Sequence, residues 1–265
     1  GLGDVYKRQE VEGGICAPKG FAAAGVHCGI RANHSEKYDL ALIKADVRCA
    51  AAGVYTTNKV CGAPIKVDRA HLKDGYAQAI IVNSGNANTC AANGVALAEE
   101  CCELVGKALG IAAEDVLPSS TGVIGQTLNI AAIRAGMPAA AAGLTAGPEG
   151  SDAAARAIMT TDTVKKELAL ACSIGGRTVT LGAIAKGSGM IHPNMGTMLC
   201  FVTTDCAITR EMLSEALREV VPRTFNRVTV DGDTSTNDMC AVLALSLIHI
   251  FEPTRHLRIS YAVFC

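Results

Sequence analysis

Apolar and polar positions follow two periodicities along this chain, and each periodicity predicts one kind of element. Apolar runs typical of buried strands lie at 40–46 (LALIKAD), 78–83 (QAIIVN), 177–185 (RTVTLGAIA) and 199–204. Residues 94–109 repeat apolar side chains at helical spacing and end before Gly110, and residues 211–221 (EMLSEALREVV) predict a second amphipathic helix. Strands that alternate with helices predict an α/β layered protein.

The segments between these runs are rich in turn residues. Asn and Gly are dense at 83–89 (NSGNANT), which predicts a loop that leaves a strand. Residues 116–126 predict a strand that ends in a turn, and residues 227–231 (RVTVD) predict one further strand. Residues 136–154 are rich in Ala, Gly and Pro, so we expect them to be the most flexible part of the chain.

Composition narrows the class of protein. Of the 265 residues 49% are hydrophobic and 18% charged, which is typical of a folded core. With five Tyr, five Phe and no Trp, that core is expected to consist of Ala, Val, Ile and Leu. The net charge of −1, without a basic stripe, argues against nucleic acid as a partner. No apolar run is long enough to cross a membrane and no secretory signal is present, so we expect a cytoplasmic protein.

Twelve cysteines are spread along the chain without a single CxxC pair. Zinc sites usually need such closely spaced pairs, and secreted disulfide scaffolds are shorter chains. We therefore expect the cysteines to be small buried side chains in a reducing compartment, and we assign neither a metal site nor a cofactor.

The two ends differ from the rest of the chain. Residues 1–9 (GLGDVYKRQ) and 246–265 (SLIHIFEPTRHLRISYAVFC) resemble translated sequencing adaptor, so we expect both to be artefacts. The informative chain is then 10–245, which stops inside a domain. We therefore expect a fold that is incomplete at its C-terminus, with apolar strand edges left unpaired after position 197, and an inactive fragment.

Candidate chemistry is concentrated at residues 185–199 (AKGSGMIHPNMGTML), between two predicted strands. A glycine at 196 permits backbone conformations closed to other residues, so a strained bond between Gly196 and Thr197 is feasible. If that bond breaks, the Thr197 hydroxyl lies beside a free α-amine with an intrinsic pKa of about 8. Such an amine is a suitable general base for a hydroxyl nucleophile. Taken alone, the segment is more simply a glycine-rich turn between strands.

Seven motifs in a fixed order change that interpretation. They are APKGFAAAGVHCGI, VYTTNKVCGAP, AIIVNSGNANTC, PSSTGVIGQ, AIMTTDT, IAKGSGMIHPNMGTML and FNRVTVDGDTSTND. Over residues 12–244 the chain thereby resembles the bifunctional glutamate N-acetyltransferase/ornithine acetyltransferase family of arginine biosynthesis, ArgJ. The resemblance implies an α/β/β/α layered sandwich of the ArgJ/DmpA type. It also implies a precursor that cleaves itself into an α chain, here residues 10–196, and a β chain of which residues 197–245 are present.

The reaction is implied by the same resemblance. Self-cleavage between Gly196 and Thr197 would free Thr197 as the nucleophile. Thr197 would take the acetyl group from N2-acetylornithine, release ornithine, and pass the acetyl group to L-glutamate; bifunctional members also accept acetyl-CoA. The two chains would stay together as an α2β2 heterotetramer.

Further site residues are implied motif by motif. Thr121 and Gly122 match the family's oxyanion pair, which is a side-chain hydroxyl and a backbone N–H. Lys186 matches a substrate-binding lysine, and its charge suits the α-carboxylate shared by ornithine and glutamate. Thr160 matches a further substrate contact, with Thr161 as the adjacent alternative.

Three interpretations of these residues stay open. Related folds use a self-liberated N-terminal nucleophile to hydrolyse amides, so an amidohydrolase or aminopeptidase is the alternative enzyme. The third interpretation is an inactive truncated fragment.

The acidic turn DGDTSTND contains Asp231, Asp233 and Asn237, and the spacing of these residues would suit a metal site. Because the resemblance implies no metal, we interpret this turn as structural and close to the site.

Overall fold

The computed structural model describes residues 8–31, 37–174, 176–190 and 198–248. Nine strands form one sheet in these ranges. Its order is β1 (Arg8–Glu10), β6 (Lys166–Ile174), β7 (Arg177–Lys186), β8 (Leu199–Cys206), β9 (Met239–Ile248), β3 (Leu40–Tyr55), β4 (Tyr76–Asn86) and β5 (Val116–Val123), and β2 (Phe21–Val26) pairs with β3 beside this path.

Strand β3 joins the two halves of the sheet. Its residues 40–45 pair with β2, whereas residues 50–55 pair with β9, and its register against β4 shifts between Lys44 and Cys49. One face of the sheet is shared by both halves, because Ile43 and Val82 lie in the same buried cluster as Phe201 and Leu243. The two halves are therefore two sheet layers around a common apolar interior.

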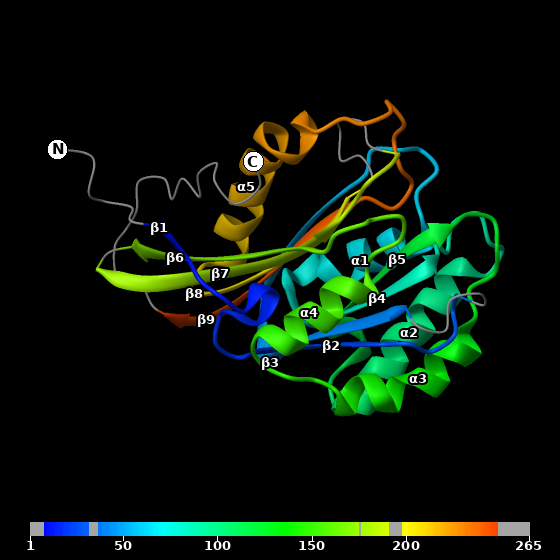
Figure 1. Cartoon of the computed structure of the whole chain (residues 1–265), viewed down its shortest axis with the longest axis horizontal. Coiled ribbons are helices and arrows are strands. Elements are labelled where there is room, and N and C mark those ends of the chain that lie inside the picture. The colour runs from blue at the N-terminus through cyan, green and yellow to red at the C-terminus, as the bar shows by residue number, and fades with distance from the viewer. Residues whose placement is uncertain (1–7, 32–36, 175, 191–197, 249–265) are drawn as a thin grey trace.

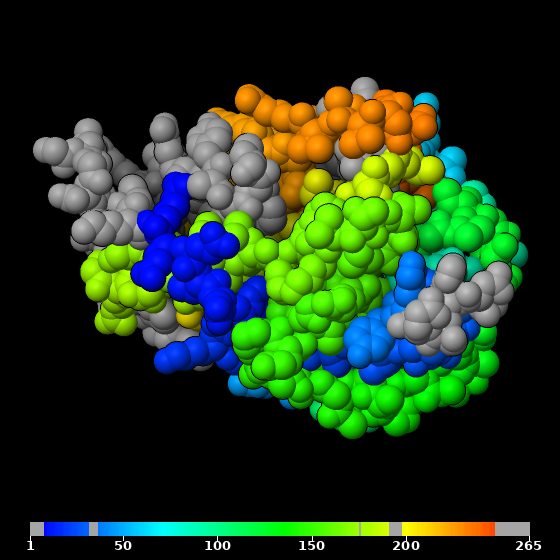
Figure 2. All heavy atoms as spheres, viewed as in Figure 1, coloured from blue at the N-terminus to red at the C-terminus, as the bar shows by residue number. Residues whose placement is uncertain are grey.

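Helices cover the outer faces of both layers. On one side α1 (Ala63–His71), α2 (Gly94–Leu109) and α3 (Ile130–Ala142) pack on β3, β4 and β5, and on the other α5 (Arg210–Val220) packs on β8 and β9. Figure 1 shows α5 and α3 on opposite sides of the strands. In Figure 2 the orange segment after β8 and the green segments of α3 and α4 (Pro148–Ala157) form opposite parts of the surface. The layered α/β fold predicted from the sequence is confirmed.

Most of the predicted elements are present, and two of the strands are longer than predicted. The helices at 94–109 and 211–221 and the strands at 40–46, 78–83, 177–185 and 199–204 are confirmed within one or two residues at most ends. However, β3 continues to Tyr55, and β4 continues to Asn86 through half of the predicted loop at 83–89.

Two local predictions are wrong. Residues 136–154 are not a flexible segment but belong mostly to helices α3 and α4. Alanine is the best helix former, and the small side chains permit close packing: a Cβ at Gly136 would lie 2.3 Å from the Cβ of Cys28. Residues 227–231 form no strand, and Val230 is 61% exposed, so the alternation there does not bury one face.

The strands that follow position 197 are fully paired. β8 lies between β7 and β9, and β9 lies between β8 and β3. The expectation of unpaired apolar edges is therefore wrong for these two strands. β9 also extends to Ile248, into the range 246–265 that was expected to be an artefact; residues 1–7 and 249–265 lie outside the described ranges.

The cysteines that the structure describes are free thiols; most are buried, and Cys90 is exposed. None of the helices in the described part of the chain is long and apolar enough to cross a membrane.

The shared interior can be tested at Phe201, which is fully buried on β8. Phe201→Ala removes a large apolar side chain and leaves a cavity, so we expect the free energy of unfolding to fall by about 3–5 kcal/mol. Urea titration followed by circular dichroism measures this change. Val164→Ala is the control, because Val164 is 68% exposed and its truncation should cost less than about 0.5 kcal/mol. Equal stability of the two variants would contradict the two-layer packing.

Candidate active site

Lys186 brings three of the predicted site residues together. It is the last residue of β7 and is only 3% exposed. Its Nζ donates hydrogen bonds to Thr121 Oγ1 (3.1 Å), near the end of β5, and to Thr160 Oγ1 (2.9 Å), in the segment after α4. Residues from three distant segments thus meet at hydrogen-bond distance around one buried ammonium.

The electrostatics of Lys186 are those of a cation removed from water. Burial lowers the pKa of Lys186, because the ammonium loses its hydration. The carboxyl groups of Asp162 and Asp238 act in the opposite direction and limit that decrease. The charge of Lys186 therefore depends on acidic neighbours that the sequence analysis did not assign to the site.

Asp162 fixes the segment that carries Thr160. Its Oδ1 accepts hydrogen bonds from Gly187 N (2.8 Å) and Lys166 Nζ (2.6 Å), and its Oδ2 accepts one from Thr160 N (3.3 Å). Burial alone would raise the pKa of Asp162, but the hydrogen bonds to Lys166 and Gly187 outweigh it and the pKa is lowered. An ionised Asp162 thus ties the backbone at Thr160 to the end of β7.

The structure distinguishes between the two adjacent threonines. The Thr161 hydroxyl shares a hydrogen bond of 2.6 Å with Ser188 Oγ, whereas Thr160 contacts Lys186. Thr160, and not its alternative, is therefore the neighbour of the buried lysine.

Gly122 has a backbone that requires glycine. Its φ is +134°, and a Cβ there would lie 2.3 Å from the carbonyl carbon of Gly85 and 2.6 Å from Asn86 N. Gly85 on β4 is its register partner in the parallel pairing of β4 with β5. The Gly122 backbone therefore lies directly against β4, next to the buried hydroxyl of Thr121.

A buried amide supports the same strand end. Asn237 Nδ2 donates to the carbonyls of Ala87 (2.7 Å) and Ser120 (2.9 Å), and Thr89 Oγ1 donates to Asn237 Oδ1 (2.7 Å). Asn237 therefore connects the turn before β9 to the residue that precedes Thr121. This agrees with its interpretation as a structural residue close to the site.

One acidic residue of the preceding turn binds backbone N–H groups. Asp231 accepts hydrogen bonds from the backbone N–H of Met190 and of Asp233, the latter at 3.3 Å. Within the described ranges, no group of three or more His, Cys, Asp or Glu side chains could hold a metal ion.

Asp238 is a buried carboxyl group beside the predicted cleavage position. It is 1% exposed, and its Oδ1 accepts a hydrogen bond from Met198 N (2.9 Å). No group in the described part of the chain donates to its Oδ2. Burial raises the pKa of Asp238 to about 8, and the Met198 N–H limits that rise. Gly196 and Thr197 themselves lie outside the described residues, directly before Met198.

Sequence reasoning missed Asp162 and Asp238 as members of the site. The available signal was position: Asp162 lies within the MTTDT motif, and Asp238 directly precedes the apolar run at 239–245. This signal is weak, because carboxyl groups are rarely buried and only the fold shows that these two are.

The fold and the site together define a class. This is a layered α/β protein in which a buried lysine at the end of β7 contacts two threonine hydroxyls, one of them next to a glycine near the end of β5. The sequence model of the ArgJ family matches residues 22–261, and the chain belongs to that family.

Curated relatives carry the same family name. The arginine biosynthesis bifunctional protein ArgJ of Symbiobacterium thermophilum is 55% identical over 236 residues, which cover 89% of this chain and 58% of that protein. The protein of the same name from Bacillus subtilis is 49% identical over 237 residues, which cover 89% of this chain and 57% of that protein. The chain thus spans less than three fifths of the length of these relatives.

Solved structures match the fold. The crystal structure of the Bacillus halodurans ArgJ protein matches with a TM-score of 0.68 and 37% identity, covering 74% of this chain and 100% of that chain. The Mycobacterium tuberculosis ornithine acetyltransferase complexed with ornithine matches with a TM-score of 0.65 and 36% identity, covering 73% and 100%. A Pyrococcus horikoshii protein with 13% identity and a TM-score of 0.51 shares the fold alone.

The raised pKa of Asp238 predicts a pH-dependent stability. A carboxyl group whose pKa is about 8 when folded and about 3.9 when unfolded binds its proton more tightly in the folded state. Its contribution to stability is complete below about pH 4 and is lost as the pH rises to about 8. Asp238→Asn should remove this loss, so the variant should exceed the parent in unfolding free energy at pH 8.

Urea unfolding between pH 5 and pH 9 measures the difference. Asp46→Asn is the matched control, because Asp46 is exposed and the substitution makes the same chemical change. The control should lose stability in parallel with the parent. A parallel loss in Asp238→Asn would contradict the assignment.

Proposed function

We propose that this protein is an acetyltransferase of arginine biosynthesis, which moves acetyl from N2-acetylornithine to L-glutamate through an acetyl-Thr197 intermediate. The observation that carries the proposal is the contact of Lys186 with both Thr121 and Thr160, beside Gly122. The relatives support the substrate class, because they are bifunctional proteins of arginine biosynthesis and an ornithine acetyltransferase with bound ornithine.

Self-cleavage between Gly196 and Thr197 prepares the nucleophile. It divides the chain into an α chain, residues 10–196, and a β chain that begins at Thr197. The two crystal chains that are covered completely align with about three quarters of this chain, which is also the share that residues 1–196 make up. This agreement in length supports the position of the cut.

The freed α-amine of Thr197 then acts as the base. It takes the hydroxyl proton while the hydroxyl oxygen attacks the acetyl carbonyl of N2-acetylornithine. The tetrahedral intermediate collapses, the amide C–N bond breaks, and the proton passes to the departing amine of ornithine. The amino group of glutamate next attacks the acetyl ester, which restores the Thr197 hydroxyl and yields N-acetylglutamate.

Thr121 and Gly122 stabilise the oxyanion formed in both steps. Because Thr121 Oγ1 accepts a hydrogen bond from Lys186, its own proton is available for donation to the substrate oxygen. The Gly122 N–H is the second donor. Lys186 and Thr160 contact the α-carboxylate that both substrates share.

Acetyl-CoA serves as a second acetyl donor, and the reaction uses no cofactor. The α and β chains stay together and form an α2β2 heterotetramer.

Cleavage and transfer are tested in one protein of full family length. Residues 10–245 are joined to the C-terminal part of the Symbiobacterium thermophilum relative, which we term the full-length chimera. Mass spectrometry should find two chains, the second beginning at Thr197. Thr197→Ala should give one uncut chain without acetyl transfer, whereas the control Thr178→Ala, at an exposed position on β7, should be cut and active. A cut and active Thr197→Ala variant would exclude Thr197 as the nucleophile.

Product analysis of the same reactions separates a transferase from a hydrolase. Chromatography with mass detection should find N-acetylglutamate when glutamate is present. Acetate that forms at the same rate with and without glutamate would favour the amidohydrolase.

The two roles at the buried lysine predict different kinetic defects. Thr121→Ala removes one oxyanion donor, so kcat should fall by about 10²-fold with little change in KM. Lys186→Ala removes a carboxylate contact, so KM for both N2-acetylornithine and glutamate should rise. Initial rates in the full-length chimera measure both parameters. The reverse pattern, a KM effect for Thr121 and a pure kcat effect for Lys186, would reverse the assigned roles.

A further inference from the structure

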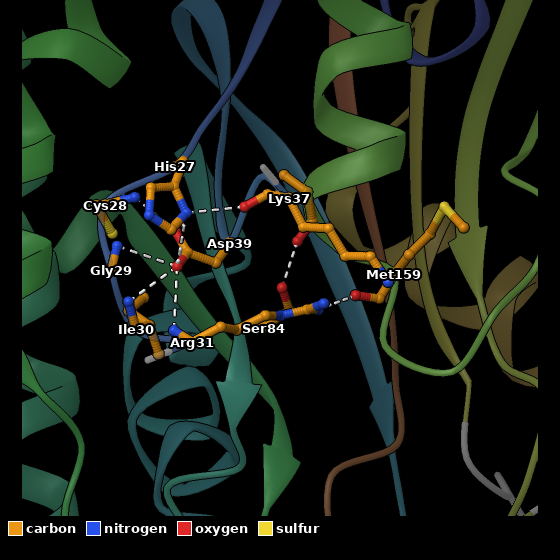
Figure 3. Close-up of polar contacts among 10 residues, drawn as sticks. His27, Cys28, Gly29, Ile30, Arg31, Lys37, Asp39, Ser84 and Met159 are labelled. Carbon is orange, nitrogen blue, oxygen red and sulfur yellow. Dashed lines mark hydrogen bonds and ion pairs between the residues drawn. The ribbon is translucent and has the colours of Figure 1, made fainter. Parts of the chain in front are cut away.

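A loop before β3 is fixed by one buried carboxylate. Asp39 is fully buried and accepts hydrogen bonds from the backbone N–H groups of all four residues 28–31, at 2.7–3.2 Å (Figure 3). Four donors on one buried carboxyl group hold this backbone in a single conformation. These hydrogen bonds therefore fix the backbone of Arg31, from which its side chain extends.

From this loop the Arg31 side chain extends to the candidate active site. The aliphatic part of the Arg31 side chain packs on Gly85: a Cβ on that glycine would lie 2.7 Å from Arg31 Cγ. Gly85 is also the register partner of Gly122. Its Nη2 donates a hydrogen bond to the carbonyl of Met159, as Figure 3 shows. The guanidinium thus ends beside the residue that precedes Thr160.

The charge of Arg31 has no carboxylate partner among the residues that the structure describes. Its Nε is buried without a hydrogen-bond partner, and both Asp39 oxygens are already bound to backbone N–H groups. Burial lowers the pKa of Arg31, and the nearby Asp39 carboxyl limits that decrease without forming an ion pair with the guanidinium. The charge of Arg31 in turn lowers the pKa of Lys186. Two cations therefore flank Thr160 and repel one another, an arrangement that an anion placed near both would relieve.

A cavity of about 810 Å³ gives a ligand access to this guanidinium. Arg31 and Thr160 both line it. Two further cations of the lining are neutralised: Arg156 Nε pairs with Asp152 (2.7 Å), and Lys165 Nζ pairs with Asp152 (2.6 Å) and with Glu167 (2.5 Å). Lys37 is a fourth cation of the lining, and Glu149, Asp152, Asp162 and Glu167 supply four carboxylates. The cavity is therefore not a basic surface for a polyphosphate. Of its two guanidinium groups, that of Arg156 is paired, and that of Arg31 has no ion pair within the described residues.

We propose that Arg31 is a substrate-binding residue that, with Lys186 and Thr160, receives the α-carboxylate of the amino-acid substrate. This inference rests on the proposed function and adds a residue to it. Lys186 Nζ already donates to two hydroxyls, so one of its three N–H groups remains for a ligand. A planar guanidinium supplies the two parallel donors that a carboxylate accepts.

The test compares two acetyl donors that differ only in the carboxylate. N2-acetylornithine has it, and N-acetylputrescine is the same molecule without it. In the full-length chimera, Arg31→Met should lower kcat/KM for N2-acetylornithine by about 10- to 100-fold, mainly through KM. The same variant should leave kcat/KM for N-acetylputrescine nearly unchanged, because that donor never made the contact.

Two further variants control for charge and for the cavity. Arg31→Lys keeps the cation and should recover part of the selectivity for N2-acetylornithine. Arg156→Gln removes a guanidinium from the same cavity, but one that is paired with Asp152, and should keep the selectivity of the parent.

Two other outcomes would overturn the proposal. An equal loss with both donors would show that Arg31 is structural and would overturn the proposal. A rise in KM for acetyl-CoA alone would assign the guanidinium to a phosphate and would also overturn it.

If the parent transfers acetyl from neither N2-acetylornithine nor N-acetylputrescine, the proposed function fails. Calorimetry with ornithine and putrescine then decides the role of Arg31 separately. Selective loss of ornithine binding in Arg31→Met would support that role. Equal binding of ornithine by parent and variant, or no binding by either, would refute it.

Discussion

The burial of one ammonium group sets the conditions for the rest of this site. Lys186 is almost completely removed from water, and an uncompensated charge at such a place would be prohibitively costly. Its compensation comes from elements that are far apart in sequence: the end of β5, the segment after α4 and the turn before β9. The two sheet layers must therefore be assembled correctly before this lysine can be buried. The site is consequently a property of the whole fold and not of one motif.

The other buried polar groups are satisfied mainly by backbone atoms. Asp39 binds four N–H groups of one loop, Asp162 binds those of Thr160 and Gly187, and Asn237 binds two carbonyls. Backbone partners cost no side-chain entropy, so these contacts are rigid. Asp238 departs from this pattern, since one of its oxygens lacks a donor in the described structure. Polar groups that the fold leaves unsatisfied are common where chemistry occurs.

Sequence reasoning found the elements with strong periodicity and the residues that belong to recognisable motifs. The helix at 94–109 has both a clear apolar face and a glycine stop, and Lys186, Thr121 and Thr160 each lie in a distinctive motif. The Ala-rich helices α3 and α4 were missed because small residues carry little periodic signal, and close packing reveals itself only in three dimensions.

The acidic residues of the site were missed for a different reason. Asp162 and Asp238 look like ordinary polar positions until the fold buries their side chains, and burial is a long-range property. The same holds for Arg31, which directly follows the motif AAAGVHCGI; nothing in the sequence there indicates that its side chain reaches Met159.

The position of β8 has a consequence for any break in the chain ahead of Met198. β7 belongs to the part of the chain before that point and β8 to the part after it, yet the two are hydrogen-bonded neighbours, and β9 is likewise joined to β3. A cut between β7 and β8 would therefore leave the hydrogen bonds of both strand pairs intact. The two pieces would form one folded unit. Neither would be stable alone, because each would expose the strand edges that the other covers. Severing the chain and keeping the molecule whole are therefore compatible in this topology.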